Sequence, residues 1–66
     1  MSDYVAIAFT KISVIREHNK TGVLDFDIPV GEGRKETLEL LDNLRRFDYK
    51  VEVINKTSAK VSWSDL

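Results

Sequence analysis

Nucleophilic catalysis needs a cysteine or serine activated by a neighbouring base, and this chain offers little of that chemistry. It has no cysteine and a single histidine, His18, which stands in the run His-Asn-Lys-Thr-Gly. Such a run is typical of a solvated turn. None of the serines lies in the Gly-x-Ser-x-Gly context of a nucleophile elbow. The sequence therefore favours a protein that is not an enzyme.

Two carboxylates, Asp25 and Asp27, have the spacing that places side chains on the same face of a strand. Carboxylate oxygens are ligands for divalent cations, but Ca²⁺ takes roughly six or more oxygens. No third ligand follows at a recognisable spacing. We interpret the pair as part of a polar outer face, and we predict neither a metal nor another cofactor.

The segment Gly31-Glu32-Gly33-Arg34-Lys35 places a glycine turn and two basic residues at the expected start of a helix. Free amides at a helix N-terminus can bind anions. However, the glycine spacing fits neither a P-loop nor a dinucleotide fingerprint, and Glu32 would repel an anion. Arg34 and Lys35 also stand where the helix dipole favours acidic residues, so we expect contacts or solubility to account for them.

Nucleic-acid binding would use the basic residues at the two ends of that helix, Arg34 and Lys35 at its start and Arg45 and Arg46 at its end. Acidic residues are interspersed among them, and the net charge of the chain is −1. A phosphate-binding surface requires a local excess of positive charge. Nucleic-acid binding is therefore the alternative hypothesis.

The length of 66 residues predicts a single domain, residues 1–66, near the lower limit for a stable hydrophobic core. Without cysteine no disulfide can reinforce it. No apolar run approaches the length of a membrane span, and the first one lacks the basic flank of a secretory signal. These features predict a cytoplasmic protein that does not enter a membrane.

The most regular element expected is a helix over residues 34–48. Its apolar residues share one face of a helical wheel and its charged residues the other; the apolar set is Thr37, Leu40, Leu41, Leu44 and Phe47. Gly33 is the expected N-cap, with Glu36 at the third helical position. An apolar helix face must be buried, and a sheet is the natural surface to bury it.

The rest of the chain alternates apolar and polar residues and predicts four strands. The first is a long strand over residues 4–16, in which a slip of phase after Thr10 indicates a β-bulge. A turn over residues 18–22, with Gly22 free to adopt positive φ, joins it to a strand over residues 23–28. Two further strands follow the helix, over residues 49–54 and 59–64. We therefore predict an α+β fold of order ββαββ, with one helix on one face of a four-stranded antiparallel sheet.

The predicted core is the inward face of these elements. It comprises Val5, Ile7, Phe9, Ile12, Val14, Leu24, Phe26, Ile28, Leu40, Leu41, Leu44, Phe47, Val51, Val53, Val61 and Trp63. The opposite sheet face would carry Tyr4, Ala6, Ala8, Ile15 and Ile54 among charged residues. A half-apolar face of this kind favours docking of a second chain, either another copy or a different protein.

A hairpin ending in Phe26-Asp27-Ile28-Pro29-Val30, a short gap, a helix containing Leu38-Glu39-Leu40 and a following strand lie between Val14 and Val53. This layout resembles that of short phage-encoded inhibitors of bacterial RNA polymerase from the T7 group. The resemblance implies a ββαβ fold and a host-takeover function, in which the protein grips the polymerase and blocks transcription. The sequence departs from that family on the strand after the helix, where Val53 and Asn55 replace arginines that make key contacts.

The leading hypothesis is a small non-enzymatic protein-binding module, a phage or bacterial regulator or inhibitor that binds a host protein by surface complementarity. The residues expected to contact the partner are Tyr4, Arg34, Lys35, Arg45, Arg46 and Trp63.

Overall fold

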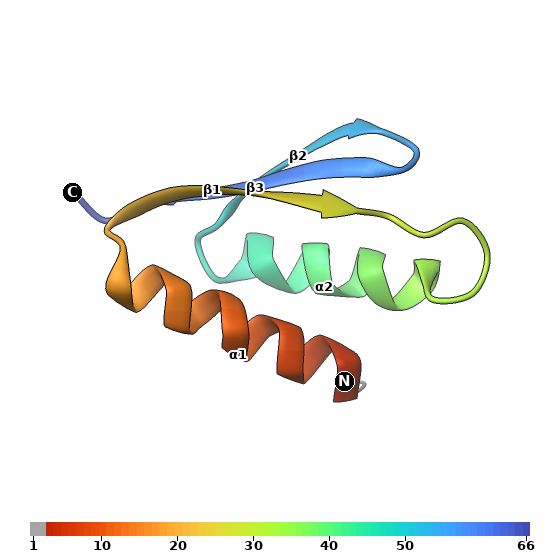
Figure 1. Cartoon of the computed structure of the whole chain (residues 1–66), viewed down its shortest axis with the longest axis horizontal. Coiled ribbons are helices and arrows are strands. Elements are labelled where there is room, and N and C mark those ends of the chain that lie inside the picture. The colour runs from red at the N-terminus through yellow and green to blue at the C-terminus, as the bar shows by residue number, and fades with distance from the viewer. Residues whose placement is uncertain (1–2) are drawn as a thin grey trace.

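The computed structural model describes residues 3–66, which form two helices and a three-stranded antiparallel sheet (Figure 1). In chain order the elements are α1 (Asp3–His18), β1 (Thr21–Asp27), α2 (Arg34–Arg46), β2 (Lys50–Asn55) and β3 (Ser58–Ser64). The α+β class and the antiparallel sheet are confirmed. The four strands, the single helix and the order ββαββ are wrong, because the first predicted strand is a helix.

Helix α1 replaces the strand predicted over residues 4–16. Residues 4–15 are apolar at most positions, so a helical spacing is present beside the alternation: Val5 and Ile12 are buried, and Ala8 and Phe9 pack against the core. No glycine or proline interrupts the segment. Its apolar residues therefore fit a helix as well as a strand, and packing decides between the two.

The ends of α1 carry the expected helix signals. Asp3 lies in the first turn, and Arg16 and His18 lie in the last turn, which are the signs of charge that the helix dipole favours. The hydroxyl of Thr10 donates to the carbonyl of Ala6 at 2.9 Å, within the helix. The change of phase after Thr10 therefore reflects helical periodicity and not a β-bulge.

In the sheet, β3 is the central strand and the order is β1-β3-β2. Both outer strands are antiparallel to β3: Thr21 of β1 lies opposite Ser64, and Lys50 of β2 lies opposite Ser62. The ladder between β2 and β3 is irregular between Val53 and Asn55. β1 and β2 therefore run parallel to each other, and α2 connects them.

Both helices lie on the same side of the sheet, with α2 next to the sheet and α1 packed beside α2 (Figure 1). The buried core joins both helices to the strands. Its apolar members are Val5, Ile12, Ile28, Leu40, Leu41, Leu44, Tyr49, Ala59, Val61 and Trp63. Neither helix is long and apolar enough to span a bilayer, considering residues 3–66.

Most of the predicted core is confirmed, including all three leucines at the buried face of α2 and Val61 and Trp63 of β3. Four predicted members are exposed instead: Ile7, Val14, Phe47 and Val53. Ile7 and Val14 turn to solvent because α1 is helical. Tyr49, which was not included in the predicted core, is buried.

Candidate protein-binding site

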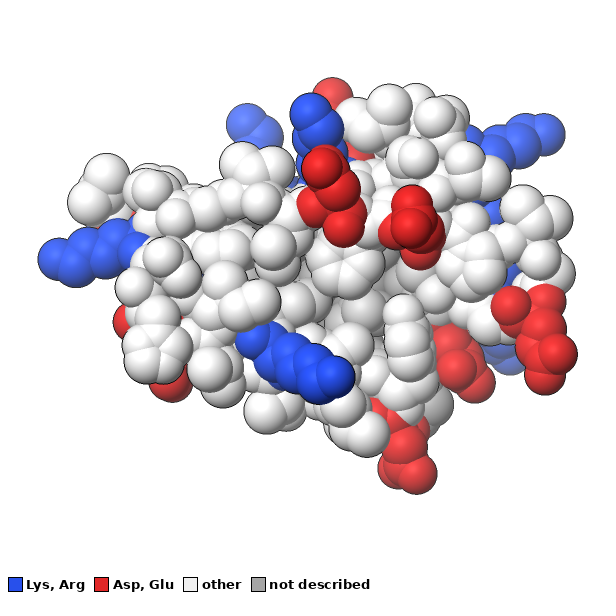
Figure 2. Space-filling view, viewed as in Figure 1, with Lys and Arg blue, Asp and Glu red and all other residues white. Residues whose placement is uncertain are grey.

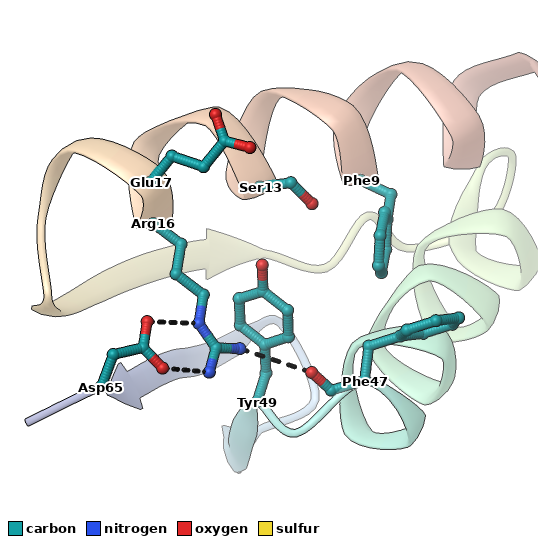
Figure 3. Close-up of a pocket in the computed structure, with 7 residues that line it drawn as sticks. All are labelled: Phe9, Ser13, Arg16, Glu17, Phe47, Tyr49 and Asp65. Carbon is teal, nitrogen blue, oxygen red and sulfur yellow. Dashed lines mark hydrogen bonds and ion pairs between the residues drawn. The ribbon is translucent and has the colours of Figure 1, made fainter.

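A surface pocket of about 340 Å³ opens where the C-terminal half of α1 meets the end of α2 and the chain after β3 (Figure 3). Three segments that are distant in the sequence meet there. The residues that line the pocket are Phe9, Ser13, Arg16, Glu17, Phe47, Tyr49 and Asp65.

Helix α1 supplies one wall. Phe9, Ser13 and Arg16 are spaced by four and three residues, which places their side chains on one flank of a helix. Glu17 follows at the rim, with its carboxylate directed away from the pocket (Figure 3). The helical conformation of residues 3–18 is therefore what creates this wall.

The end of α2 supplies the opposite wall through its C-cap. The amide of Tyr49 donates to the carbonyl of Leu44 at 3.1 Å, and Asp48 adopts a left-handed conformation with φ of 69°. This is the hydrogen-bond pattern of a Schellman motif, which reverses the chain sharply after a helix. The reversal places Phe47 at the surface and Tyr49 in the core, although they are only two residues apart.

The aromatic rings form a continuous series. Phe9 meets Phe47 edge to face with ring centroids 5.1 Å apart, and it meets Tyr49 at 6.2 Å. Tyr49 in turn contacts Trp63 at 6.1 Å. The series runs from the buried Trp63 to Phe47, whose side chain is 59% exposed. The outermost ring therefore presents a large apolar surface to solvent at the mouth of the pocket.

Arg16 forms the floor of the pocket, and each of its three side-chain nitrogens donates a hydrogen bond. Its Nε and Nη2 donate to the two carboxylate oxygens of Asp65 at 2.8 and 2.5 Å, and its Nη1 donates to the carbonyl of Phe47 at 3.4 Å (Figure 3). The guanidinium also stacks 4.7 Å from the centre of the Tyr49 ring. Such a bidentate, stacked arginine holds α1, the end of α2 and the chain after β3 together.

The Arg16–Asp65 pair shifts the pKa of both groups. The hydrogen bonds to Asp65 raise the pKa of Arg16, and the Arg16 guanidinium lowers the pKa of the Asp65 carboxyl below its ordinary value of 3.8. Both groups are thus charged at neutral pH. Since Asp65 neutralises the charge of Arg16 and each side-chain nitrogen of Arg16 already donates within the chain, the floor is a poor site for an anion.

Apart from Arg16 and Asp65, the polar side chains that line the pocket are the neutral Ser13 and the carboxylate of Glu17, which can only accept hydrogen bonds. Among residues 3–66, neither the Ser13 hydroxyl nor the Glu17 carboxylate has a hydrogen-bond or ion-pair partner. Asp48 approaches Arg16 only at 3.9 Å, and its side chain is 96% exposed. Glu17 and Asp48 therefore give the pocket an acidic rim, whereas the charge of Asp65 is neutralised by Arg16. The pocket is therefore suited to an apolar or cationic group and poorly suited to a phosphate.

None of the six predicted contact residues lines this pocket. Arg34 donates to the carbonyl of Lys56 at 2.8 Å, and Arg46 pairs with Asp42 at 3.2 Å. Lys35 and Arg45 are exposed at opposite ends of α2, and Tyr4 is exposed on α1.

Trp63 is buried in the core, and its Nε1 donates to the carbonyl of Asn19 at 2.7 Å. It therefore stabilises the fold and is not at the surface. The predicted docking face also separates, because Tyr4, Ala6, Ala8 and Ile15 lie on α1 whereas Ile54 lies on β2. These residues do not form one face of a sheet.

The pocket residues were not identified from the sequence, because Phe9 and Phe47 were assigned to the core and Arg16 to a strand. A helical reading of residues 4–16 is the signal that would have brought Phe9, Ser13 and Arg16 together. The pairing of Arg16 with Asp65 spans 49 residues, and no local pattern indicates it.

The other candidate sites remain without support from the geometry. His18 is exposed at the end of α1, and Asp25 and Asp27 are exposed on β1. Within the described part of the chain, no three His, Asp or Glu side chains gather closely enough to hold a metal ion.

Comparison of the chain with protein-family models, with curated proteins and with solved structures found no match. β1, α2 and β2 do reproduce the strand, helix and strand of the layout noted in the sequence. The hairpin of that layout is absent, because residues 14–18 form the last turns of α1.

Proposed function

We propose that the protein is a non-enzymatic protein-binding module whose aromatic pocket receives a side chain of a partner protein. The observation that carries this proposal is the exposed ring of Phe47 resting on Phe9 at an open pocket. Exposed aromatic residues beside a pocket are typical anchors of protein interfaces, where a few such contacts supply most of the binding energy. The fixed position of Phe47 on its C-cap lowers the entropy lost on binding.

The chemistry of the rim indicates what the partner side chain is. Glu17 lines the rim without a partner, and the exposed Asp48 approaches Arg16 only at 3.9 Å, so negative charge remains near the pocket beyond the Arg16–Asp65 pair. An arginine or lysine can pack its aliphatic part on the rings and direct its charge to these carboxylates. The preferred ligand is therefore a basic residue next to an apolar one, on the surface of the partner.

In this proposal the chain acts by occupying a surface of another protein, which is how a small phage or bacterial regulator or inhibitor of a host protein would act. Two features support a binding role over a catalytic one. The only charged groups in the pocket floor are paired with each other, and three of the seven residues that line this open pocket are aromatic. The strand, helix and strand formed by β1, α2 and β2, which are the part of the layout resembling phage inhibitors of RNA polymerase that is present, are compatible with this role.

Nucleic-acid binding remains the alternative. Figure 2 shows basic and acidic side chains interspersed over the face it presents, with uncharged surface between them. Arg34 and Lys35 lie at one end of α2 and Arg45 and Arg46 at the other, and even Lys35 and Arg45 are about 15 Å apart along the helix at 1.5 Å per residue. Titration with short DNA and RNA at low and high salt tests this alternative: no binding at low salt removes it, and tight, salt-sensitive binding would replace our proposal.

Selection from a displayed peptide library tests the proposed function. Wild-type protein as bait is expected to enrich peptides that carry Arg or Lys beside an apolar residue. The same selection on Phe47→Ala should lose these sequences, whereas Leu38→Ala, which trims an exposed apolar residue of α2 outside the pocket, should retain them. Equal enrichment on wild type and Phe47→Ala would contradict a binding role for this pocket.

A further inference from the structure

Both helices end beside the aromatic pocket. α1 and α2 run in the same direction, so their C-terminal ends lie at the same end of the molecule (Figure 1). The hydrogen bond from Arg16, in the last turn of α1, to the carbonyl of Phe47, just after α2, joins these two ends. A helix dipole places partial negative charge at the C-terminus. The fields of the two helices therefore add at the pocket, where they favour a cation.

Two carboxylates stand where these helix fields disfavour them. Glu17 is the second-to-last residue of α1, and Asp48 is the second residue after α2. Acidic side chains are unfavourable near a helix C-terminus. Within residues 3–66, Glu17 has no hydrogen-bond or ion-pair partner, and the closest cation to Asp48 is Arg16 at 3.9 Å. Since neither carboxylate gains a close contact from the fold, both are available to a cationic ligand.

The groove on the other flank of α1 lacks this excess of negative charge. It has a volume of about 250 Å³ and lies between α1 and the outer strand β1. Its lining is apolar except for one cation, Lys11, and one carboxylate, Asp25. The two charges balance, so they do not select a ligand of one sign. Of these two hollows beside α1, the aromatic pocket is the one whose surroundings select a cation.

The lining of the aromatic pocket favours a guanidinium over an ammonium group. Phe9 and Phe47 supply ring surfaces, on which a planar and weakly hydrated guanidinium stacks, whereas an ammonium is compact and strongly hydrated. Ser13 and Glu17 are four residues apart on α1, which makes their side chains neighbours about 5 to 6 Å apart at Cβ. Both side chains can accept hydrogen bonds. The fork of donors on a guanidinium can reach two such acceptors while its plane rests on a ring.

We infer that the partner side chain is an arginine, which stacks on the Phe9–Phe47 wall and donates to Ser13 and Glu17. Arginine recognition rests on the proposed function of the pocket and goes further, because it assigns the acceptors that distinguish arginine from lysine. Glu17 is exposed, with its carboxylate directed away from the pocket (Figure 3). A change of its side-chain rotamer brings the carboxylate over the mouth of the pocket without disturbing a contact of the fold.

Three pools of labelled hexapeptides test the preference for arginine. Each pool has a leucine next to one fixed residue, which is arginine, lysine or citrulline, and the other positions are randomised. Citrulline keeps the shape of arginine without its charge. In fluorescence polarisation, wild-type protein should bind the arginine pool about 10-fold more tightly than the lysine pool, and the citrulline pool most weakly. Equal binding of the arginine and lysine pools would overturn this inference and leave a binding role for the pocket, whereas no binding of either pool would contradict the proposed function itself.

Variants of the two acceptors test their assignment. Glu17→Gln should weaken binding of the arginine pool about 5-fold and change binding of the citrulline pool less than about 2-fold. Its urea midpoint of unfolding should not fall, because Glu17 opposes the helix dipole. Ser13→Ala should reduce the preference for arginine over lysine. Glu39→Gln, which removes an exposed carboxylate of α2 outside the pocket, is the matched control and should bind as wild type does. Wild-type affinity of Glu17→Gln for the arginine pool would overturn the inference.

Discussion

The contact between Gly22 and Trp63 shows how one glycine shapes the packing of the sheet. They lie opposite each other in β1 and β3, and a Cβ built on Gly22 would come within 2.5 Å of Trp63 Cζ2. The sequence was interpreted as a turn in which Gly22 adopts positive φ, and that interpretation is wrong: among the described glycines, only Gly31 and Gly33 do so. Because glycine has no side chain, Gly22 instead leaves room for the indole of Trp63 to pack over it, as aromatic residues do on strand glycines.

We expect Gly22→Ala to lower the free energy of unfolding by about 1 to 3 kcal/mol, because the new methyl group overlaps the indole. Urea denaturation followed by tryptophan fluorescence measures this loss. Thr21→Ala, at the neighbouring exposed position, should change stability by less than about 0.5 kcal/mol. If steric overlap is the cause, Gly22→Ala should cost less in a Trp63→Phe background; an equal cost there would contradict it.

Asp48 is the one described non-glycine residue with positive φ, at 69°, and its side chain is almost fully exposed. A glycine adopts this conformation without strain. Asp48→Gly should therefore raise the free energy of unfolding by about 0.5 to 1 kcal/mol. Asp42→Gly, within α2, should lower it by about 1 kcal/mol, because glycine is unfavourable in a helix interior. Destabilisation by Asp48→Gly in the same denaturation experiment would show that the Asp48 side chain has a role of its own.

At the scale of elements, residues 3–18 explain why the sequence predicts only part of the fold. α2 was located from the sequence because its apolar residues recur only at helical spacing and its other face is charged. In α1 almost all residues from Tyr4 to Ile15 are apolar or small, so alternation and helical spacing coexist. Which of the two forms depends on packing against α2, which is tertiary information. The pocket depends on α1 and on the distant Arg16–Asp65 pair, so it could not be predicted without the fold.

The Arg16–Asp65 ion pair connects secondary-structure elements, because it joins α1 to the chain after β3. Arg16 lowers the pKa of Asp65 in the folded state. At pH values between that lowered pKa and the unfolded value near 3.8, the unfolded chain therefore binds more protons than the folded chain. The contribution of the pair to stability is therefore complete above that unfolded value and is lost as the pH falls through the folded pKa.

Asp65→Asn should accordingly lower the unfolding midpoint at pH 7, and its difference from wild type should shrink as the pH is lowered toward 2. Denaturant unfolding curves over this pH range measure the change. Glu32→Gln, which removes a carboxylate without an ion-pair partner among the described residues, is the control and should remain close to wild type throughout. A difference between Asp65→Asn and wild type that stays constant with pH would contradict a role for this ion pair.

At the scale of the whole molecule, one helix separates two surfaces with different chemistry. The core-facing residues Val5 and Ile12 of α1 lie between a flank that borders the aromatic pocket and a flank that borders β1. The pocket side presents rings with an acidic rim, whereas the strand side presents free backbone groups beside an apolar groove.

The affinity of a peptide enriched on wild-type protein for the Phe47→Ala variant tests the central claim most directly. Phe47 is 59% exposed, so its removal should leave the fold stable while it removes the outer wall of the pocket. By isothermal titration calorimetry we expect Phe47→Ala to raise the dissociation constant about 10- to 100-fold and Leu38→Ala to change it less than about 2-fold. A Phe47→Ala protein that is folded and binds the peptide as tightly as wild type would contradict the account.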